Sequence, residues 1–288
     1  MHRREFLATS LAATGAVSLT TIATAQTKPE SKRDDPKPGK LKQSVCRWCF
    51  SGMKLDELCE TAKNIGLKSV ELLDEKEWGT PTKYGLVCAV GNGPTRIHDG
   101  YNKHDNHEKF TKALETLIPK AAEMGVPNII VFSGNRNNMP DDIGLKNCAE
   151  GLRKITPIAE KHKVTLVMEL LNSKVDHKDY MCDRTPWGAS LVKAVNSERF
   201  KLLYDIYHMQ IMEGDVIRTI RDYAPAIAHY HTAGVPGRQD LDETQELFYP
   251  AISRAILETG FEGYFAQEFI PKDEPIAALR KAFETCNV

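Results

Sequence analysis

From residue 41 onward, short apolar runs alternate with amphipathic helical segments along the whole chain. Strict alternation of strand and helix predicts parallel strands that are joined by right-handed crossovers. The apolar runs show no clean alternation of apolar and polar residues, as expected for strands that are covered on both faces. Eight such units fit a closed α/β barrel, a single (β/α)₈ TIM barrel, better than an open sheet. The strands are expected at residues 41–50, 69–73, 86–90, 128–132, 164–171, 200–207, 227–231 and 264–269.

The segments between these strands have the apolar periodicity of helices that pack on a sheet. The chain has 288 residues, of which 41% are apolar, and this suits one large barrel domain. No Gly-rich dinucleotide fingerprint follows the first strand, so a nicotinamide cofactor is not expected. Helices are expected at residues 54–65, 107–124, 141–162, 188–195, 215–223, 244–259 and 274–285.

The first 25 residues have the pattern of an export signal rather than of a folded element. A charged start that contains Arg3 and Arg4 precedes a mild apolar run over residues 8–23, and a small-x-small motif ends at Ala25. This order is typical of a secretory signal peptide, and the paired arginines resemble a twin-arginine signal. The run is shorter and more polar than the ~20 apolar residues of a membrane anchor, which is the alternative interpretation. We expect the twin-arginine export machinery as a partner and a periplasmic or otherwise exported protein.

Residues 26–40 consist mostly of charged, small, Pro and Gly residues. Such a segment cannot bury enough apolar surface to fold, so we expect a disordered linker before a barrel domain at residues 41–288. Lys plus Arg (38) nearly balances Asp plus Glu (39), which leaves no electrostatic footprint for nucleic acid. A small neutral or anionic substrate remains open. The sequence is compatible with a homo-oligomer but does not specify one.

Seven cysteines are scattered along the chain, and their odd number argues against a disulfide framework. Cys46 and Cys49 form a C-x-x-C pair, which is found in redox and zinc sites. No second pair and no H-x-x-x-H motif follows, and both residues lie in an apolar run. The favoured interpretation is therefore a pair of buried thiols in the first strand.

Polar side chains end four consecutive predicted strands, where the functional groups of a parallel barrel lie. In chain order they are Glu169, Asp205, His231 and Glu268. Each residue alone is an ordinary cap or salt-bridge partner, but four in adjacent units would converge on one rim. Three carboxylates at one point repel one another and could not all ionise without a cation. The set predicts one divalent metal ion, with Mn²⁺ or Mg²⁺ favoured and Co²⁺ or Zn²⁺ as alternatives.

Two further residues are expected to bind substrate at the same rim. His208 lies three residues after Asp205, where it could donate to a substrate oxygen or support a metal ligand from behind. Arg238 lies in a Gly/Pro-rich loop after the seventh strand, where a guanidinium can hold a hydroxyl or a carboxylate. The alternative for Arg238 is a loop salt bridge with Asp240 or Asp242. The nearby His229 is interpreted as a structural residue.

The runs from Asp205 to Gln210 and from His229 to Arg238, together with Glu268 before Phe-Ile-Pro, resemble the hydroxypyruvate isomerase family. This family belongs to the xylose isomerase-like barrels, which also include tagatose and psicose 3-epimerases and endonuclease IV. The resemblance covers residues 41–288 and is strongest in the second half.

The resemblance implies that Glu169 and Glu268 bind the metal and shuttle a proton, and that Asp205 is a further ligand. The ligand on the seventh strand is often Gln in hydroxypyruvate isomerases and His in the epimerases. This chain has His231 at that position.

Together these features predict a metal-dependent isomerase of a sugar or hydroxypyruvate-type substrate, which moves a proton between adjacent carbons through an enediolate. Glu169 and Glu268 are the expected catalytic residues. A ketose 3-epimerase on the same site and an exported sugar-binding barrel without turnover are the alternatives. An endonuclease IV-like nuclease is disfavoured because the fourth strand ends at residues 131–136 without a histidine.

Overall fold

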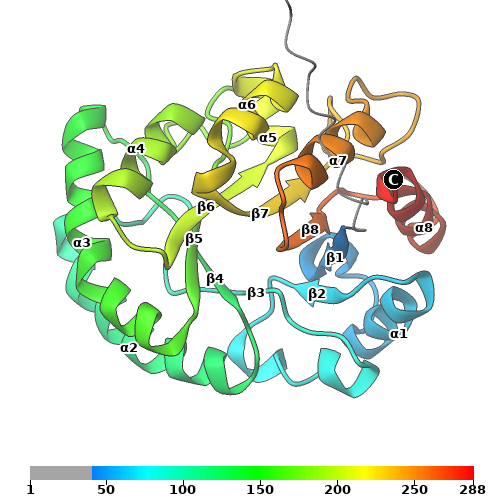
Figure 1. Ribbon diagram of the computed structural model, residues 1–288, viewed down its shortest axis with the longest axis horizontal. Helices are drawn as coiled ribbons and strands as arrows, with labels where there is room; N and C mark the ends of the chain where they lie inside the picture. The colour runs from blue at the N-terminus through cyan, green and yellow to red at the C-terminus, as the bar shows by residue number, and fades with distance from the viewer. Residues whose placement is uncertain (1–40) are drawn as a thin grey trace, which may run out of the picture. The chain divides into compact units, whose positions relative to one another are not determined.

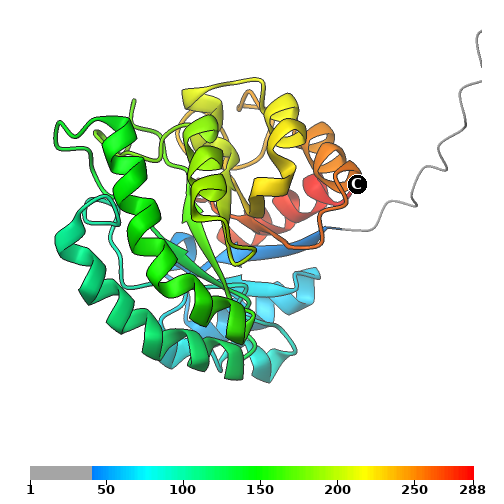
Figure 2. The ribbon, with the colours of Figure 1, turned by 60° about the vertical axis from the view of Figure 1, so that its left-hand side comes forward.

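The computed structural model describes residues 41–288, in which eight strands form a ring inside a layer of helices (Figure 1, Figure 2). The strand order is β2-β1-β8-β7-β6-β5-β4-β3, and every pairing within it is parallel. The ring nearly closes between β2 and β3, where the Leu72 N–H donates to the Val90 carbonyl at 2.8 Å. The predicted (β/α)₈ barrel is therefore confirmed.

The strands are β1 Lys42–Cys46, β2 Ser69–Glu71, β3 Val90–Gly91, β4 Asn128–Val131, β5 Thr165–Glu169, β6 Phe200–Asp205, β7 Ile227–Thr232 and β8 Tyr264–Gln267. The helices are α1 Leu55–Ile65, α2 His107–Glu123, α3 Asp141–His162, α4 Thr185–Val195, α5 Ile206–Met212, α6 Val216–Tyr223, α7 Tyr249–Glu258 and α8 Pro275–Cys286.

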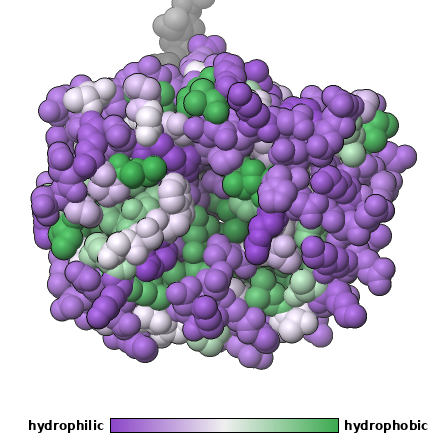
Figure 3. All heavy atoms as spheres, turned by 180° about the vertical axis from the view of Figure 1, so that it is seen from behind, coloured by the Kyte–Doolittle hydropathy of each residue, from purple (hydrophilic) through white to green (hydrophobic). Residues whose placement is uncertain are grey.

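The main core lies between the strands and the surrounding helices, and a smaller apolar cluster joins four neighbouring strands. Its buried members are Val90, Ile130, Val167 and Leu203. Side chains two residues apart on a strand share a face, so the faces that carry Val167 and Leu203 also carry the strand-end carboxylates. One face of the molecule is hollowed at its centre, and hydrophobic side chains gather in the hollow within a mainly polar surround (Figure 3).

Several predicted elements differ from the structure, among them the third strand, which is Val90–Gly91 and not residues 86–90. The first strand ends at Cys46, and a short 3₁₀ helix at Arg47–Phe50 follows, so Cys49 does not lie in the strand. Helix α5 begins directly after β6 because the Asp205 carboxylate caps it, accepting the His208 N–H at 3.0 Å. Helix α7 begins at Tyr249 and not at residue 244, with a proline in its first turn, where a missing N–H has no cost.

The predicted signal peptide (1–25) and linker (26–40) lie outside the described residues and stay predictions. The seven cysteines are free. Burial raises the pKa of the Cys46 and Cys49 thiols well above its usual range, which disfavours a redox-active thiolate at this C-x-x-C pair. Within residues 41–288, the helices lack the combination of length and apolar character that crossing a membrane requires.

Candidate functional site

The structure brings the four predicted ligand residues together at the carboxyl ends of four adjacent strands. Glu169 and Asp205 are the last residues of β5 and β6, His231 is near the end of β7, and Glu268 directly follows β8. The parallel register fixes this convergence, since Asp205 pairs directly with His231 in the ladder. One possible ligand atom from each residue lies within 4.8 Å of the other three, and all four side chains are buried.

Two cationic groups lie among the three carboxylates. His231 Nδ1 lies 2.7 Å from Glu268 Oε2 and 3.2 Å from Glu169 Oε1. Arg238 Nη2 lies 2.9 Å from Asp205 Oδ2 and also contacts Glu268 Oε2. The carboxylates thus share one small volume, which the protein itself fills with positive charge.

The pKa values of the three carboxyl groups are shifted because the groups are buried close together. Burial, with the charge of Glu268, raises the pKa of Glu169, and burial raises the pKa of Asp205 to about 7. For Glu268 the burial effect is outweighed by the neighbouring His231 and Arg238 charges, so its pKa falls well below the usual range. Burial opposes a charge on His231, but Glu268 outweighs it and raises the pKa of the imidazole.

The donor set fits a divalent cation chemically. Three carboxylate oxygens and one imidazole nitrogen within a single small volume are the ligands of hard-to-borderline ions such as Mg²⁺, Mn²⁺ and Zn²⁺. Such an ion would let all three acids ionise at neutral pH, because its charge offsets the burial and the mutual repulsion that raise the pKa of Glu169 and Asp205.

His208 and Arg238, the two predicted substrate contacts, are in contact with each other beside the cluster. His208 Nδ1 lies 2.7 Å from Asn172 Nδ2, and burial together with the Arg238 charge lowers the pKa of the imidazole well below its usual range. The guanidinium carbon of Arg238 lies near two aromatic rings, 5.5 Å from the ring centre of Trp48 and 5.0 Å from that of Tyr207. The alternative of a loop salt bridge is wrong, because the guanidinium contacts the buried acids of the cluster instead.

The cluster opens onto a cavity of about 530 Å³. Glu169, His208, Arg238 and Glu268 all contribute to its lining. The lining also includes the apolar side chains of Leu72, Ile97, Ile130, Phe132 and Leu171. A small molecule in this cavity would therefore contact both glutamates and both predicted substrate-binding residues.

Two residues of the site were missed by the sequence reasoning. The Trp48 Nε1–H donates to Glu268 Oε1 at 2.7 Å, and Trp48 lies just past β1, at the same rim as the four predicted ligands. Glu71, the last residue of β2, contacts His231 Nε2 at 3.0 Å. The sequence pattern that predicted Glu169 as a site residue, a carboxylate at the end of an apolar strand, is also present at Glu71.

Fold and site together define a (β/α)₈ barrel with a buried candidate metal centre and an adjoining cavity. Residues 59–286 match the family described as Xylose isomerase-like TIM barrel, and the chain belongs to that family.

Curated relatives carry the names of isomerases. A putative hydroxypyruvate isomerase of Homo sapiens is 26% identical over 175 residues, which cover 59% of this chain and 63% of the human protein. A 2-oxo-tetronate isomerase of Cupriavidus necator is 32% identical over 174 residues, which cover 59% of this chain and 65% of the relative. The chain thus matches slightly less than two thirds of each of these two relatives.

Solved structures share the fold at low sequence identity. An AP endonuclease, family 2, from Brucella melitensis has a TM-score of 0.76 at 22% identity, over 83% of this chain and 97% of that one. A D-psicose 3-epimerase from Clostridium cellulolyticum H10, crystallised with D-tagatose, has a TM-score of 0.69 at 15% identity, over 84% of this chain and 90% of that one.

Proposed function

We propose that the protein is a metal-dependent isomerase that interconverts an aldose and a ketose, or the corresponding forms of a small hydroxy-keto acid. The observation that carries the proposal is the position of Glu169 and Glu268, which belong to the four-residue cluster and also line the cavity. The names of the curated relatives support an isomerase. A ketose 3-epimerase that uses the same groups is the second candidate, and it is favoured by histidine at the position of His231.

Glu169, Asp205, His231 and Glu268 would hold the ion, with Mn²⁺ or Mg²⁺ favoured and Co²⁺ or Zn²⁺ as alternatives. When bound, the ion supplies a Lewis acid that polarises the substrate carbonyl and stabilises negative charge on oxygen. The chain's own groups perform the proton transfer. One glutamate removes the proton from the carbon beside the carbonyl, and the same or the other glutamate returns it to the neighbouring carbon.

The remaining groups of the site would orient the substrate and exclude water. Arg238 is placed to donate to a substrate oxygen, and His208 contacts the same guanidinium. The apolar lining residues would exclude water from part of the cavity, which strengthens electrostatic interactions inside it.

The cavity also bears on the substrate. Its volume of about 530 Å³ lies within the range of pockets that hold drug-sized ligands, so a three-carbon keto acid would fill only part of it. Arg96 lines the cavity, and its Nη1 donates to the Thr95 carbonyl at 3.3 Å. We therefore propose a substrate longer than hydroxypyruvate, either a sugar or a hydroxy-keto acid whose carboxylate Arg96 would bind. The export signal predicted for residues 1–25 would place this reaction outside the cytoplasm.

The test is solvent deuterium exchange at the carbon beside the carbonyl, measured by NMR with ketoses and hydroxy-keto acids in the presence of Mn²⁺, Mg²⁺, Co²⁺ or Zn²⁺ in turn. We expect exchange by the wild type and a loss of about 100-fold or more in Glu169→Gln at saturating Mn²⁺. Glu262→Gln, the same change at an exposed glutamate, is the matched control. Product configuration separates the two candidates, because an epimerase inverts one carbon and leaves the carbonyl in place.

Two results would contradict the proposal. A wild-type protein that binds these compounds but exchanges no C–H proton with any of the four metals would favour a binding barrel without turnover. Unchanged exchange in Glu169→Gln would remove that glutamate from proton transfer.

A further inference from the structure

A buried carboxylate that the proposed reaction does not use lies on the far side of His231. We infer that Glu71 is a positioning residue, which holds the His231 imidazole so that Nδ1 faces the metal centre. This inference rests on the metal binding proposed above. It assigns a role to Glu71 and to its second partner, His229.

Glu71 contacts two imidazoles through the same oxygen. Its Oε1 lies 2.7 Å from His229 Nε2 and 3.0 Å from His231 Nε2, and all three side chains are 0% exposed. An ionised carboxylate only accepts hydrogen bonds, so each Nε2 must carry a hydrogen and donate it. An imidazole whose Nε2 donates has Nδ1 available as the metal ligand.

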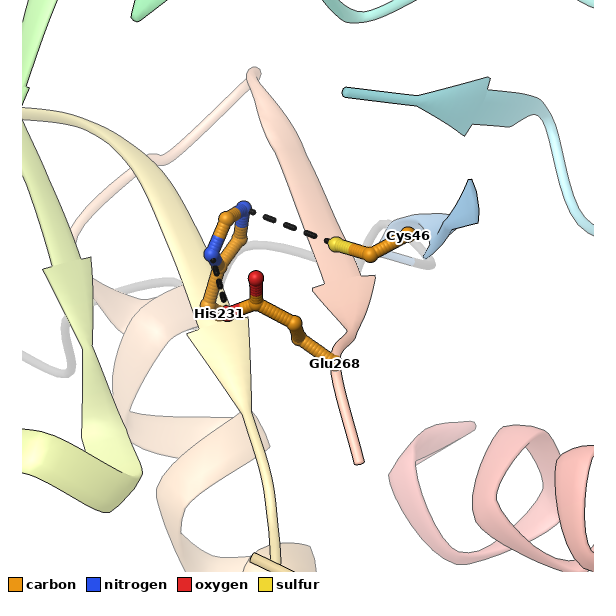
Figure 4. A group of neighbouring side chains, drawn as sticks. All are labelled: Cys46, His231 and Glu268. Carbon is orange, nitrogen blue, oxygen red and sulfur yellow. Dashed lines mark hydrogen bonds and ion pairs between the residues drawn. The ribbon is translucent and has the colours of Figure 1, made fainter. Parts of the chain in front are cut away.

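The opposite edge of the His231 ring faces the cluster of acids. Figure 4 shows the ring between Glu268 and Cys46, with one nitrogen directed to each. Nδ1 lies 2.7 Å from Glu268 Oε2, whereas Nε2 lies 3.8 Å from Cys46 Sγ. The two nitrogens therefore have separate environments, with Nδ1 on the metal side and Nε2 on the Glu71 side.

The position of Glu71 in the barrel distinguishes its contact with His231 from an ion pair between adjacent strands. Strand β2 is separated from β7 in the sheet order by β1 and β8, so the Glu71–His231 contact crosses the barrel interior. Burying a carboxylate there is costly unless it is hydrogen-bonded, and other strands of the barrel carry buried apolar residues, such as Val167 on β5 and Leu203 on β6. A carboxylate that fixes a metal-binding histidine from behind is a recurrent arrangement in metal sites.

His229 would act on His231 indirectly, by holding Glu71 in place. It lies two residues before His231 on β7, and its Nε2–H holds the same oxygen of Glu71. The carboxylate is thus anchored from two sides before any metal binds. One other arrangement is open to these atoms, since Glu71, His229 and His231 also lie close enough together to ligate a second ion. Metal stoichiometry distinguishes the two.

The main experiment measures Mn²⁺ binding by the EPR signal of free Mn²⁺ in wild type and Glu71→Gln. The glutamine keeps the shape but replaces an accepting oxygen by a donating amide or a weaker acceptor. We expect the dissociation constant to rise about 10–100-fold, and the visible absorption of the Co²⁺-loaded protein to change. Gln43→Met is the control, because it breaks a buried hydrogen bond with Gln267 and contacts none of the four ligands.

A second measurement needs only the wild type, so it can be made even if Glu71→Gln does not fold. It determines which nitrogen of His231 binds the metal. In the ¹⁵N–¹H spectrum of the Zn²⁺-loaded protein, His231 should carry its hydrogen on Nε2 and show a metal-shifted Nδ1. An Nε2 ligand, two ions per chain, or equal Mn²⁺ affinity and Co²⁺ spectra in wild type and Glu71→Gln would overturn the role of Glu71. A wild type that binds no metal would instead overturn the proposed function on which the inference rests.

Discussion

Replacing Arg238 by methionine should destabilise the metal-free protein much more than the metal-loaded protein. The Arg238 side chain is only 13% exposed, and its Nη2 contacts both Asp205 and Glu268. Removing one partner of a buried ion pair typically costs ~3–5 kcal/mol, because a buried charge is left without compensation. Burial already raises the pKa of Asp205 to about 7, so this acid can take up a proton and relieve part of the loss.

We therefore expect the lower end of that range, about 3 kcal/mol, in the absence of metal. For a domain of this size the loss corresponds to a fall in Tm of roughly 6–12 °C. A bound divalent ion supplies the missing positive charge, so the deficit should shrink at saturating Mn²⁺. Mn²⁺ stabilises the folded protein more when the protein binds it more tightly. The affinity for Mn²⁺ should rise in Arg238→Met, because the guanidinium no longer competes for the same carboxylates.

The assay is urea unfolding followed by circular dichroism, with excess EDTA or with excess Mn²⁺. Arg218→Met is the matched control, because Arg218 is 75% exposed and pairs with Asp215 at the surface. Surface pairs contribute little, so the control should change neither midpoint appreciably. Equal destabilisation of Arg238→Met with and without Mn²⁺ would refute the idea that arginine and metal neutralise the same acids.

Trp48→Phe removes the indole N–H that donates to Glu268 Oε1 at 2.7 Å. A hydrogen bond to a charged group contributes ~1.5–3 kcal/mol to stability. We therefore expect the unfolding midpoint to fall and kcat to drop about 10-fold, and an unchanged kcat would count against this contact. At Asp242, hydrogen bonds from a neighbouring threonine and lysine lower the pKa to about 2 from 3.8. Because the folded pKa is depressed, this stabilisation is present above about pH 4 and is lost as the pH falls towards 2. The difference in Tm between wild type and Asp242→Asn should accordingly be full at pH 7 and shrink below pH 4, and a constant difference would contradict the assignment.

The fold and the four-residue cluster could be predicted because each depends on order along the chain. Alternation of strand and helix determines the parallel sheet, and the parallel sheet brings the carboxyl ends of consecutive strands to one rim. Glu169, Asp205 and Glu268 each lay at the end of an apolar run, so their convergence followed from topology. The ladder shows the same logic, since Asp205 and His231 are direct partners across β6 and β7.

Contacts that cross the barrel or reverse a loop could not be predicted in this way. Glu71 and His231 lie 160 residues apart and on strands that are not neighbours. For Arg238 the nearby acids in the sequence were reasonable partners. The loop instead folds back, with a Gly234 N–H to Gln239 carbonyl bond of 2.8 Å, and directs the guanidinium to the cluster. Such geometry depends on backbone conformation that residue order does not specify.

The contacts of their individual oxygens suggest different roles for Glu169 and Glu268 in the proposed reaction. In Glu268, Oε1 accepts from Trp48 and Oε2 contacts both His231 and Arg238, so both oxygens are held. In Glu169, the contacts found within residues 41–288 involve Oε1 alone, and the side chain lines the cavity. A general base needs an oxygen within reach of the substrate proton, whereas a ligand benefits from being fixed. For the proposed reaction, this geometry makes Glu169 the better-placed base and Glu268 the more rigid of the two proposed metal ligands.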